Sequence, residues 1–243
     1  MPPPRRPSRR RPRRLRAPTQ AEVPEFYPSV APPDGATVAL TCGDEIAFHP
    51  ALLAQRGSAE GDLDPAAAAP RAELASAPPE LGLPATGWVR VAQLADLARF
   101  VAPNGDGWAQ VGVALRDGRW LLDLAGGCRL QPVVPSDRSV AEWWLDPDGP
   151  RPAPGDATIQ VVLRERACAG GASPEGRLLP PAVGVTETAV VVALLVRRRP
   201  GPNDCTGNPE FATAIKLPQP LGARALFDGG VFPPRDAARP PSP

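Results

Sequence analysis

The chain has 243 residues, of which 42% are hydrophobic and 36 are proline. Such a chain can bury one sizeable core or two small ones, which excludes a protein that is disordered throughout. The net charge is +1, but residues 1–16 hold eight arginines and no acid. The remainder is mildly acidic, so composition predicts no basic face for nucleic acid on the folded part.

Residues 1–36 are expected to form a disordered basic arm, because their closely spaced prolines prevent a helix. The arm lacks the run of roughly 7 to 15 apolar residues that defines a secretory signal peptide. Three interpretations stay open: a misassigned start whose signal peptide is missing, a solvated tail, or an arm that touches anionic partners. The longest apolar run, residues 189–196, is far shorter than the roughly 20 residues of a transmembrane helix.

The first folded elements are a strand and a helix. A strand is predicted over residues 37–42. A helix is predicted after it, with Asp64 as the N-cap, Pro65 at the first helical position and an end near Ser76. Pro70 falls inside this helix and predicts a kink or a late start.

Residues 108–124 give the clearest local pattern, because the turn signal Asp117-Gly118 separates two alternating runs. The pattern predicts a half-buried antiparallel hairpin with Gly112 opposite Asp123 on its second face. The expected apolar pairs are Leu115 with Trp120, Val113 with Leu122, and Val111 with Leu124.

Residues 87–103 are ambiguous. Their polar residues recur every three positions as on a helix, whereas their β-branched and aromatic residues favour strands. Two strands alone are marginally stable, so we expect this segment to supply two further strands. The fold predicted for residues 37–131 is thus an α+β domain, with one helix on a small antiparallel sheet.

Residues 132–157 are rich in proline and acid and are expected to be a linker, whose Trp143 and Trp144 fill the space between two domains. Short β-branched runs separated by turn residues then predict a small all-β, sandwich-like domain over residues 158–232. Residues 189–196 are apolar in both phases, which predicts a central strand covered on both faces. Residues 233–243 are expected to be a disordered proline-rich tail.

Four cysteines are present, Cys42, Cys128, Cys168 and Cys205, and they permit three pairings. Local closure favours Cys42 with Cys128 and Cys168 with Cys205. Zinc is a poor alternative, since there is no CxxC pair and the sole histidine, His49, lies seven residues beyond Cys42. Disulfides persist in oxidising compartments and are rare in the cytosol.

The stretch RERACAGGASPEG, residues 164–176, superficially suggests a nucleophile. It only approaches the GxSxG motif, and Pro174 after Ser173 would remove the backbone N–H that an oxyanion hole uses there. The run VRRRPG, residues 196–201, is interpreted as the solvated end of a strand rather than a phosphate site. No cofactor or metal motif is present in the sequence, and we expect no catalytic residue and no cofactor.

Several motifs carry a resemblance: ERACAGG with EGRL, then CTGNP, then LPQPLGARALFDGG. Together they resemble a group of uncharacterised actinobacterial secreted or lipoprotein-type proteins, with looser similarity across residues 38–234. Ala223 stands where that group usually has Asp. The resemblance implies export, paired cysteines and no assigned activity.

The sequence therefore predicts a non-catalytic, disulfide-stapled protein of the cell exterior or envelope, acting as a binding or structural accessory module. Its partner is unknown, and an envelope protein or a surface ligand is one possibility. The alternative is a cytosolic protein whose arm over residues 1–36 binds nucleic acid or another polyanion. The two hypotheses differ first in the state of the cysteines.

Overall fold

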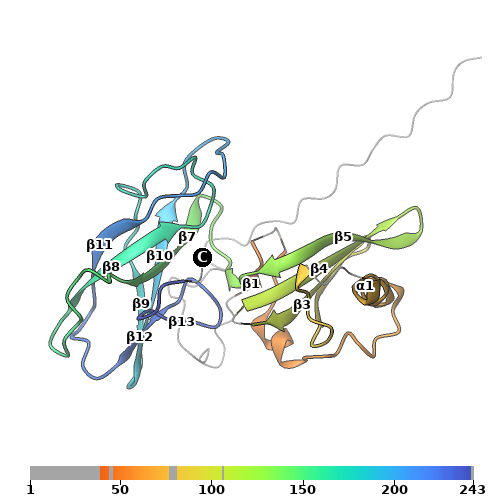
Figure 1. Cartoon of the computed structure of the whole chain (residues 1–243), viewed down its shortest axis with the longest axis horizontal. Coiled ribbons are helices and arrows are strands. Elements are labelled where there is room, and N and C mark those ends of the chain that lie inside the picture. Colours follow the sequence, from red (N-terminus) through yellow and green to blue (C-terminus); the bar gives the residue numbers. More distant parts are fainter. Residues whose placement is uncertain (1–38, 44–45, 77–80, 106, 242–243) are drawn as a thin grey trace, which may run out of the picture.

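The structure is a computed structural model, which describes residues 39–43, 46–76, 81–105 and 107–241. The expected strand over residues 37–42 lies partly outside these ranges, and the expected arm over residues 1–36 lies wholly outside them. The described chain is mostly β, with two large sheets in separate lobes and a two-stranded sheet between them (Figure 1). Its one α-helix covers part of a single sheet.

The first large sheet is a meander of four strands, β2 (Val89–Gln93), β3 (Leu97–Asn104), β4 (Gly107–Arg116) and β5 (Arg119–Cys128). Each strand is antiparallel to the next one in sequence, in the order β2-β3-β4-β5. Residues 87–103 thus supply the two predicted strands. Alternate residues face opposite ways, and both faces are buried: Trp88 and Phe100 on one, Val89 and Val101 on the other. Burial on both sides explains why this segment lacks the clean alternation of a half-exposed strand.

The β4–β5 hairpin forms around Asp117 and Gly118, whose φ angles are 51° and 77°. Positive φ at both positions is what a two-residue type I′ turn requires. The pairs Leu115–Trp120 and Val113–Leu122 are as predicted. The remaining predicted pairs are wrong, because a bulge after Gly112 shifts the register and places Gly112 opposite Leu124.

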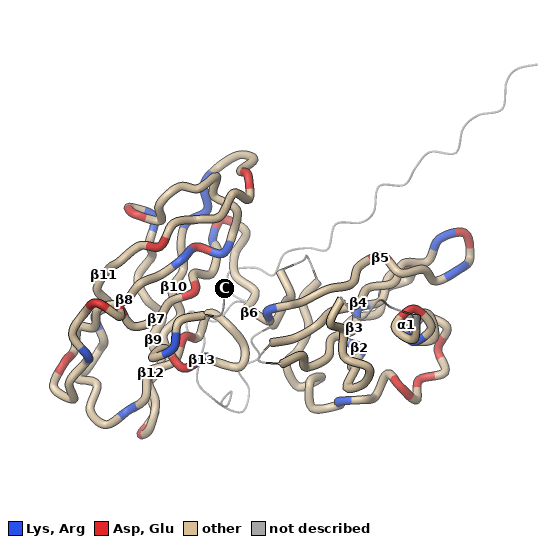
Figure 2. The backbone as a smooth tube through the Cα atoms, in the orientation of Figure 1, with Lys and Arg blue, Asp and Glu red and all other residues tan. Residues whose placement is uncertain are grey.

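The hairpin tip is also more exposed than the prediction of a half-buried hairpin implied. Leu115 and Leu122 are 37% and 40% exposed. Charged residues of both signs surround the turn, as Figure 2 shows at the far end of β4 and β5. The tip therefore projects beyond the core instead of packing on it.

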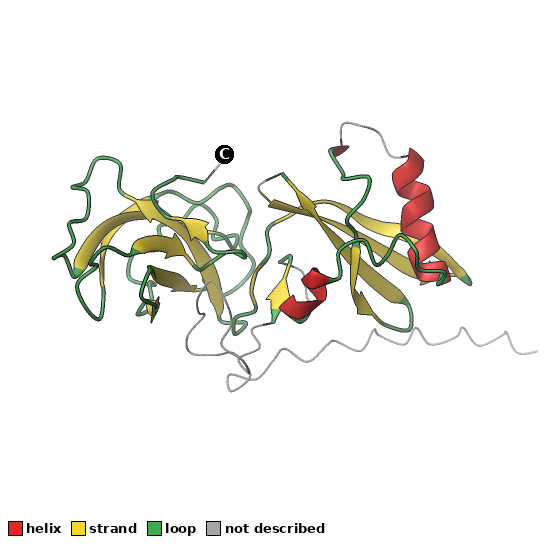
Figure 3. Ribbon diagram, turned by 90° about the horizontal axis from the view of Figure 1, so that it is seen from below, coloured by secondary structure: helices red, strands yellow, loops and turns green. Residues whose placement is uncertain are grey.

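Helix α1 (Pro65–Ser76) lies against one face of this sheet (Figure 3). It begins as predicted, with the Asp64 carboxylate accepting a hydrogen bond from the Ala66 N–H at 2.8 Å. Pro70 lies inside the helix. The contact is made by small residues, Ala66 and Ala67, which are fully buried against the sheet.

The opposite face of the sheet is covered by the start of the described chain. β1 (Leu40–Thr41) pairs with β6 (Gln131–Pro132), and the short 3-10 helix η1 (Pro50–Ala54) follows. His49 caps η1 by accepting the Ala51 N–H at its Nδ1. Leu40, Phe48 and Leu53 complete a core that also includes Ala193 from the second lobe. The two lobes therefore share apolar contact.

The second large sheet has seven strands: β7 (Arg138–Leu145), β8 (Thr158–Glu165), β9 (Ala182–Val185), β10 (Ala189–Arg197), β11 (Phe211–Lys216), β12 (Ala225–Asp228) and β13 (Arg235–Asp236). Its order is β11-β8-β7-β10-β12-β13, and β9 pairs with β10 outside this path. β10 is central and almost entirely buried, as its apolar run predicted. It pairs with β12 in parallel and with β7 and β9 antiparallel.

The predicted fold class, an α+β domain followed by a small sandwich-like domain, is wrong. The described part of the chain is mostly β and has three sheets, and strand β7 (Arg138–Leu145) lies within the expected linker. Prolines and acids flank this strand without interrupting it. Trp143 is fully buried and donates its indole N–H to the Val192 carbonyl at 2.8 Å. The Trp pair is thus part of a sheet, while the division of the chain into domains stays a prediction.

A buried carboxylate, Asp228, joins distant segments of this sheet. It accepts hydrogen bonds from the backbone N–H groups of Gly230 and Trp143, and it pairs with Arg235 at 3.2 Å. Burial, the largest influence, raises the pKa of Asp228 to about 6 despite these partners.

Among the helices of the described ranges, none is long and apolar enough to cross a membrane.

Candidate functional site

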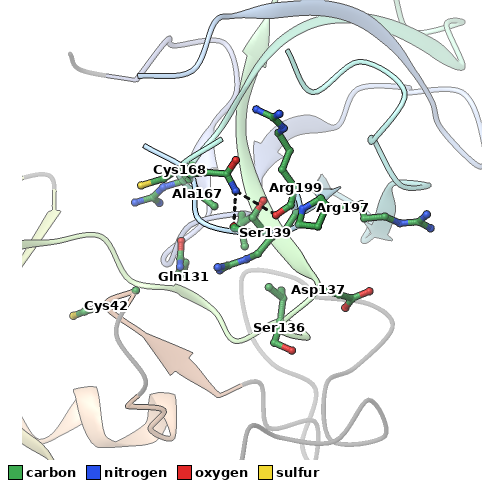
Figure 4. Close-up of a pocket in the computed structure, with 17 residues that line it drawn as sticks. Cys42, Gln131, Ser136, Asp137, Ser139, Ala167, Cys168, Arg197 and Arg199 are labelled. Atoms are coloured by element: carbon green, nitrogen blue, oxygen red, sulfur yellow. Dashed lines mark hydrogen bonds between the residues drawn. The ribbon is translucent and has the colours of Figure 1, made fainter. Parts of the chain in front are cut away.

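A cleft of about 940 Å³ opens at the junction of the lobes (Figure 4). The start of β7, the end of β10 and the turn after β8 form one wall. Cys42, Gly43 and Gln131, from the β1 and β6 region, form the other wall. Among the described residues that line the cleft are four arginines, Arg166, Arg197, Arg198 and Arg199, and a single carboxylate, Asp137.

Three of these arginines are consecutive in the sequence, and they lie where β10 leaves the core. Arg197 is the last residue of that strand. Arg198 donates its backbone N–H to the Asp137 carbonyl at 2.8 Å and its Nε to the Arg138 carbonyl at 2.7 Å. Arg199 Nη1 donates to the Ala169 carbonyl at 2.8 Å. Backbone carbonyls thus orient two of the guanidinium groups without neutralising their charge.

Arg166 lies deeper. It follows β8, and its backbone N–H donates to the Val140 carbonyl. Its Nη1 atom is buried and has no hydrogen-bond partner among the described residues. Desolvation by burial lowers the pKa of the Arg166 guanidinium from its ordinary value. A buried donor without an acceptor is costly.

The nearby buried acids are already satisfied by other partners. Glu165 accepts a hydrogen bond from the Ser139 hydroxyl at 2.9 Å and pairs with Arg177 at 2.5 Å. Glu142 pairs with Arg129 at 2.6 Å. Within the described ranges, no carboxylate lies within ion-pair distance of any of the four cleft arginines. The cleft therefore keeps an excess of positive charge.

Both predicted disulfides are present, Cys42–Cys128 and Cys168–Cys205, with Cα atoms 5.3 and 4.6 Å apart. No cysteine of the chain is free, so Cys168 is not a nucleophile. Cys42 and Cys168 lie on different walls of the cleft. Each disulfide therefore anchors one wall to its own lobe.

The other residues considered from sequence lie outside this arrangement. The Ser173 hydroxyl accepts the Glu175 backbone N–H within a turn, and His49 caps η1. Sequence reasoning missed the cleft arginines, because it treated residues 196–201 as a solvated strand end. The one available signal was that three consecutive arginines directly follow the apolar run over residues 189–196.

In the described ranges, no group of three or more His, Cys, Asp or Glu residues is placed to hold a metal ion. The sequence matches no protein-family model. No curated protein and no solved structure is significantly similar to the chain. The functional interpretation therefore depends on the cleft itself.

Proposed function

We propose that the protein is a non-catalytic binding module of the cell exterior or envelope, which holds an anionic ligand in the cleft between its lobes. The observation that carries the proposal is the set of four cleft arginines without a carboxylate partner. Guanidinium groups bind carboxylate and phosphate through paired hydrogen bonds. The cleft volume of about 940 Å³ exceeds what a single phosphate needs, and four arginines line it, so a ligand with more than one anionic group suits it best.

Binding is supported over catalysis by what lines the cleft. All four cysteines are oxidised, and the sequence's one histidine caps η1. Ser139 donates to Glu165, whose second oxygen is bound by Arg177, and no histidine lies beside it. The groups that remain are suited to holding negative charge.

Two disulfides favour an extracellular location, because such bonds are rare in the cytosol. The resemblance of the sequence motifs to secreted actinobacterial proteins implies the same location and stays a prediction. The cytosolic alternative depends on residues 1–36, which lie outside the described residues. Titration of thiols in native protein separates the two: no reactive thiol before reduction supports export, and four reactive thiols would contradict it.

Ligand binding is tested by calorimetric titration with pyrophosphate at low ionic strength. We expect saturable binding that weakens as salt is added, because salt screens charge. Arg166→Gln and Arg197→Gln should each lower the affinity about tenfold, the order of one charge-assisted contact. Arg116→Gln is the matched control, since Arg116 is 63% exposed at the hairpin tip, outside the cleft. Absence of binding, or equal loss in the control, would refute the proposal.

A further inference from the structure

A second cavity, of about 240 Å³, lies under helix α1 in the first lobe. Its walls are mostly apolar: Ala67, Pro70 and Leu74 from the helix, and Trp88 and Phe100 from the sheet. Trp88 and Phe100 are 4% and 1% exposed, so both aromatic side chains of this wall are buried. The cavity is separate from the basic cleft and shares no lining residue with it.

One charged oxygen breaks this apolar lining. Glu60 Oε1 accepts hydrogen bonds from the backbone N–H groups of Gly87 and Trp88, at 2.6 and 3.0 Å. These two bonds fix the carboxylate in place. The second oxygen, Glu60 Oε2, is buried and has no hydrogen-bond partner among the described residues. A carboxylate oxygen without a donor in a low-dielectric site strongly favours a cationic partner.

The other charged group of the lining does not satisfy this oxygen. Arg71 donates its Nη1 to the Ala59 carbonyl at 2.7 Å, and no Arg71–Glu60 ion pair forms within 4 Å. Gly57 approaches the carboxylate closely: a Cβ added there would lie 3.0 Å from Glu60 Oε2. A side chain at position 57 would therefore crowd this oxygen.

The helix that roofs the cavity is also locally unfavourable. Proline inside a helix removes a hydrogen bond and costs about 3 kcal/mol. Pro70 occupies such a position and is one of the residues that line the cavity. Departures from local structural preference concentrate at functional sites. Pro70 therefore agrees with a role for this cavity beyond packing.

We propose that this cavity binds a small apolar molecule that carries an ammonium group. The ammonium donates to Glu60 Oε2, and the apolar part packs against Trp88 and Phe100. A volume of about 240 Å³ suits a group of the size of one aromatic side chain. The site uses no residue of the anion-binding cleft, so either proposal can fail while the other stands.

The probe is phenethylamine, titrated into the full chain at neutral pH, with 3-phenylpropionate as the matched anion of similar size. Phenethylamine should bind saturably and at least tenfold more tightly than 3-phenylpropionate. Glu60→Gln keeps an acceptor for Gly87 and Trp88 but removes the charge, and it should lower the affinity about tenfold. Absence of saturable phenethylamine binding, equal binding of both probes, or undiminished binding by Glu60→Gln would overturn the proposal.

A second pair of variants does not depend on the Glu60 hydrogen bonds. Ala75 is exposed at the edge of the cavity, so Ala75→Phe should block entry and abolish binding without disturbing the interior. Ala68 is exposed on the same helix but does not line the cavity. Ala68→Phe is therefore the control, and it should bind like the wild type. Equal affinity in Ala75→Phe and Ala68→Phe would place the ligand elsewhere and reject the site.

Discussion

The two large sheets are stabilised in different ways. In the four-stranded sheet every strand pairs with its neighbour in sequence, and its core is formed by apolar side chains and small helix residues. In the seven-stranded sheet, strands distant in sequence pair, and buried polar groups join them. Asp228 reaches the Trp143 backbone across 85 residues, and Arg235 donates to the Trp143 carbonyl across 92.

This difference implies that the two sheets should respond differently to single substitutions. Local pairing spreads stability over many small contacts, so single changes should have modest effects. Long-range pairing through a few buried polar groups concentrates it, because an unsatisfied buried group is costly. Variants matched between the lobes can break or sharpen this contrast.

The largest expected effect compares the disulfides. Cys42–Cys128 closes 86 residues, and Cys168–Cys205 closes 37. Loop entropy predicts losses of about 4.5 and about 4 kcal/mol when each pair is replaced by alanine. Urea denaturation of the two double variants measures these losses. The contrast fails if loss of the Cys42–Cys128 disulfide lowers the free energy of unfolding clearly less than loss of the Cys168–Cys205 disulfide.

The next test compares two carboxylates. Glu165 is buried and bonded to Arg177 and Ser139, so Glu165→Ala should cost about 4 kcal/mol by leaving both partners unsatisfied. Asp123 is 27% exposed and pairs with the exposed Arg116 at 2.9 Å and with Arg99 at 3.5 Å, so Asp123→Ala should cost less, about 1 to 2 kcal/mol. Denaturant midpoints provide the measurement, and equal losses would remove the distinction between the lobes.

A third test uses pH. Because the folded pKa of Asp228 is raised from 3.8 to about 6, the folded state keeps a proton that the unfolded state has released. Stability should therefore fall as pH rises from about 4 to about 6, by about 3 kcal/mol. Asp228→Asn should flatten this segment of the stability curve. An unchanged slope in the variant would show that another group titrates.

Asp64 in the first lobe should give a pH dependence of stability opposite to that of Asp228. The Ala66 hydrogen bond, followed by Arg90, lowers the pKa of Asp64 below its usual value of 3.8. Its contribution is therefore present above pH 4 and is lost as pH falls further. The stability difference between wild type and Asp64→Asn should shrink below pH 4, whereas a constant difference would exclude the cap as its source.

The smallest effects compare two glycines. A Cβ on Gly230 would lie 2.8 Å from the Ala141 carbonyl and 2.7 Å from Val140, so Gly230→Ala should cost about 2 kcal/mol. A Cβ on Gly112 would meet the Arg99 guanidinium at 1.9 Å. That side-chain end can move, so Gly112→Ala should cost less than about 1 kcal/mol. Thermal unfolding ranks the two variants, and the reverse order would contradict this account.

The first lobe was largely predictable from sequence because its signals are local. The Asp64 cap, the Asp117-Gly118 turn and the strands over residues 87–103 each depend on a few adjacent residues. The bulge at Gly112 escaped prediction because Arg99, from the neighbouring strand, occupies the space that a side chain at Gly112 would need.

The second lobe was harder. Strand β7 was taken for a linker because prolines surround it, and its partners β8 and β10 come later in the chain. Strands β12 and β13 are short and carry no strong periodic signal. The cleft was not predicted for the same reason. Arg166 and Arg197 are brought together by the pairing of strands that are distant in sequence, which no local pattern indicates.

The disulfides also determine how the chain would respond to a pulling force. The loops 42–128 and 168–205 follow one another and do not interlock. A force applied at the two termini could extend only the chain outside them. At roughly 3.5 Å per residue, the loops withhold roughly 300 Å and 130 Å of contour length. The four-stranded sheet lies within the longer loop. A force at the termini could therefore extend this sheet only after the Cys42–Cys128 disulfide is reduced.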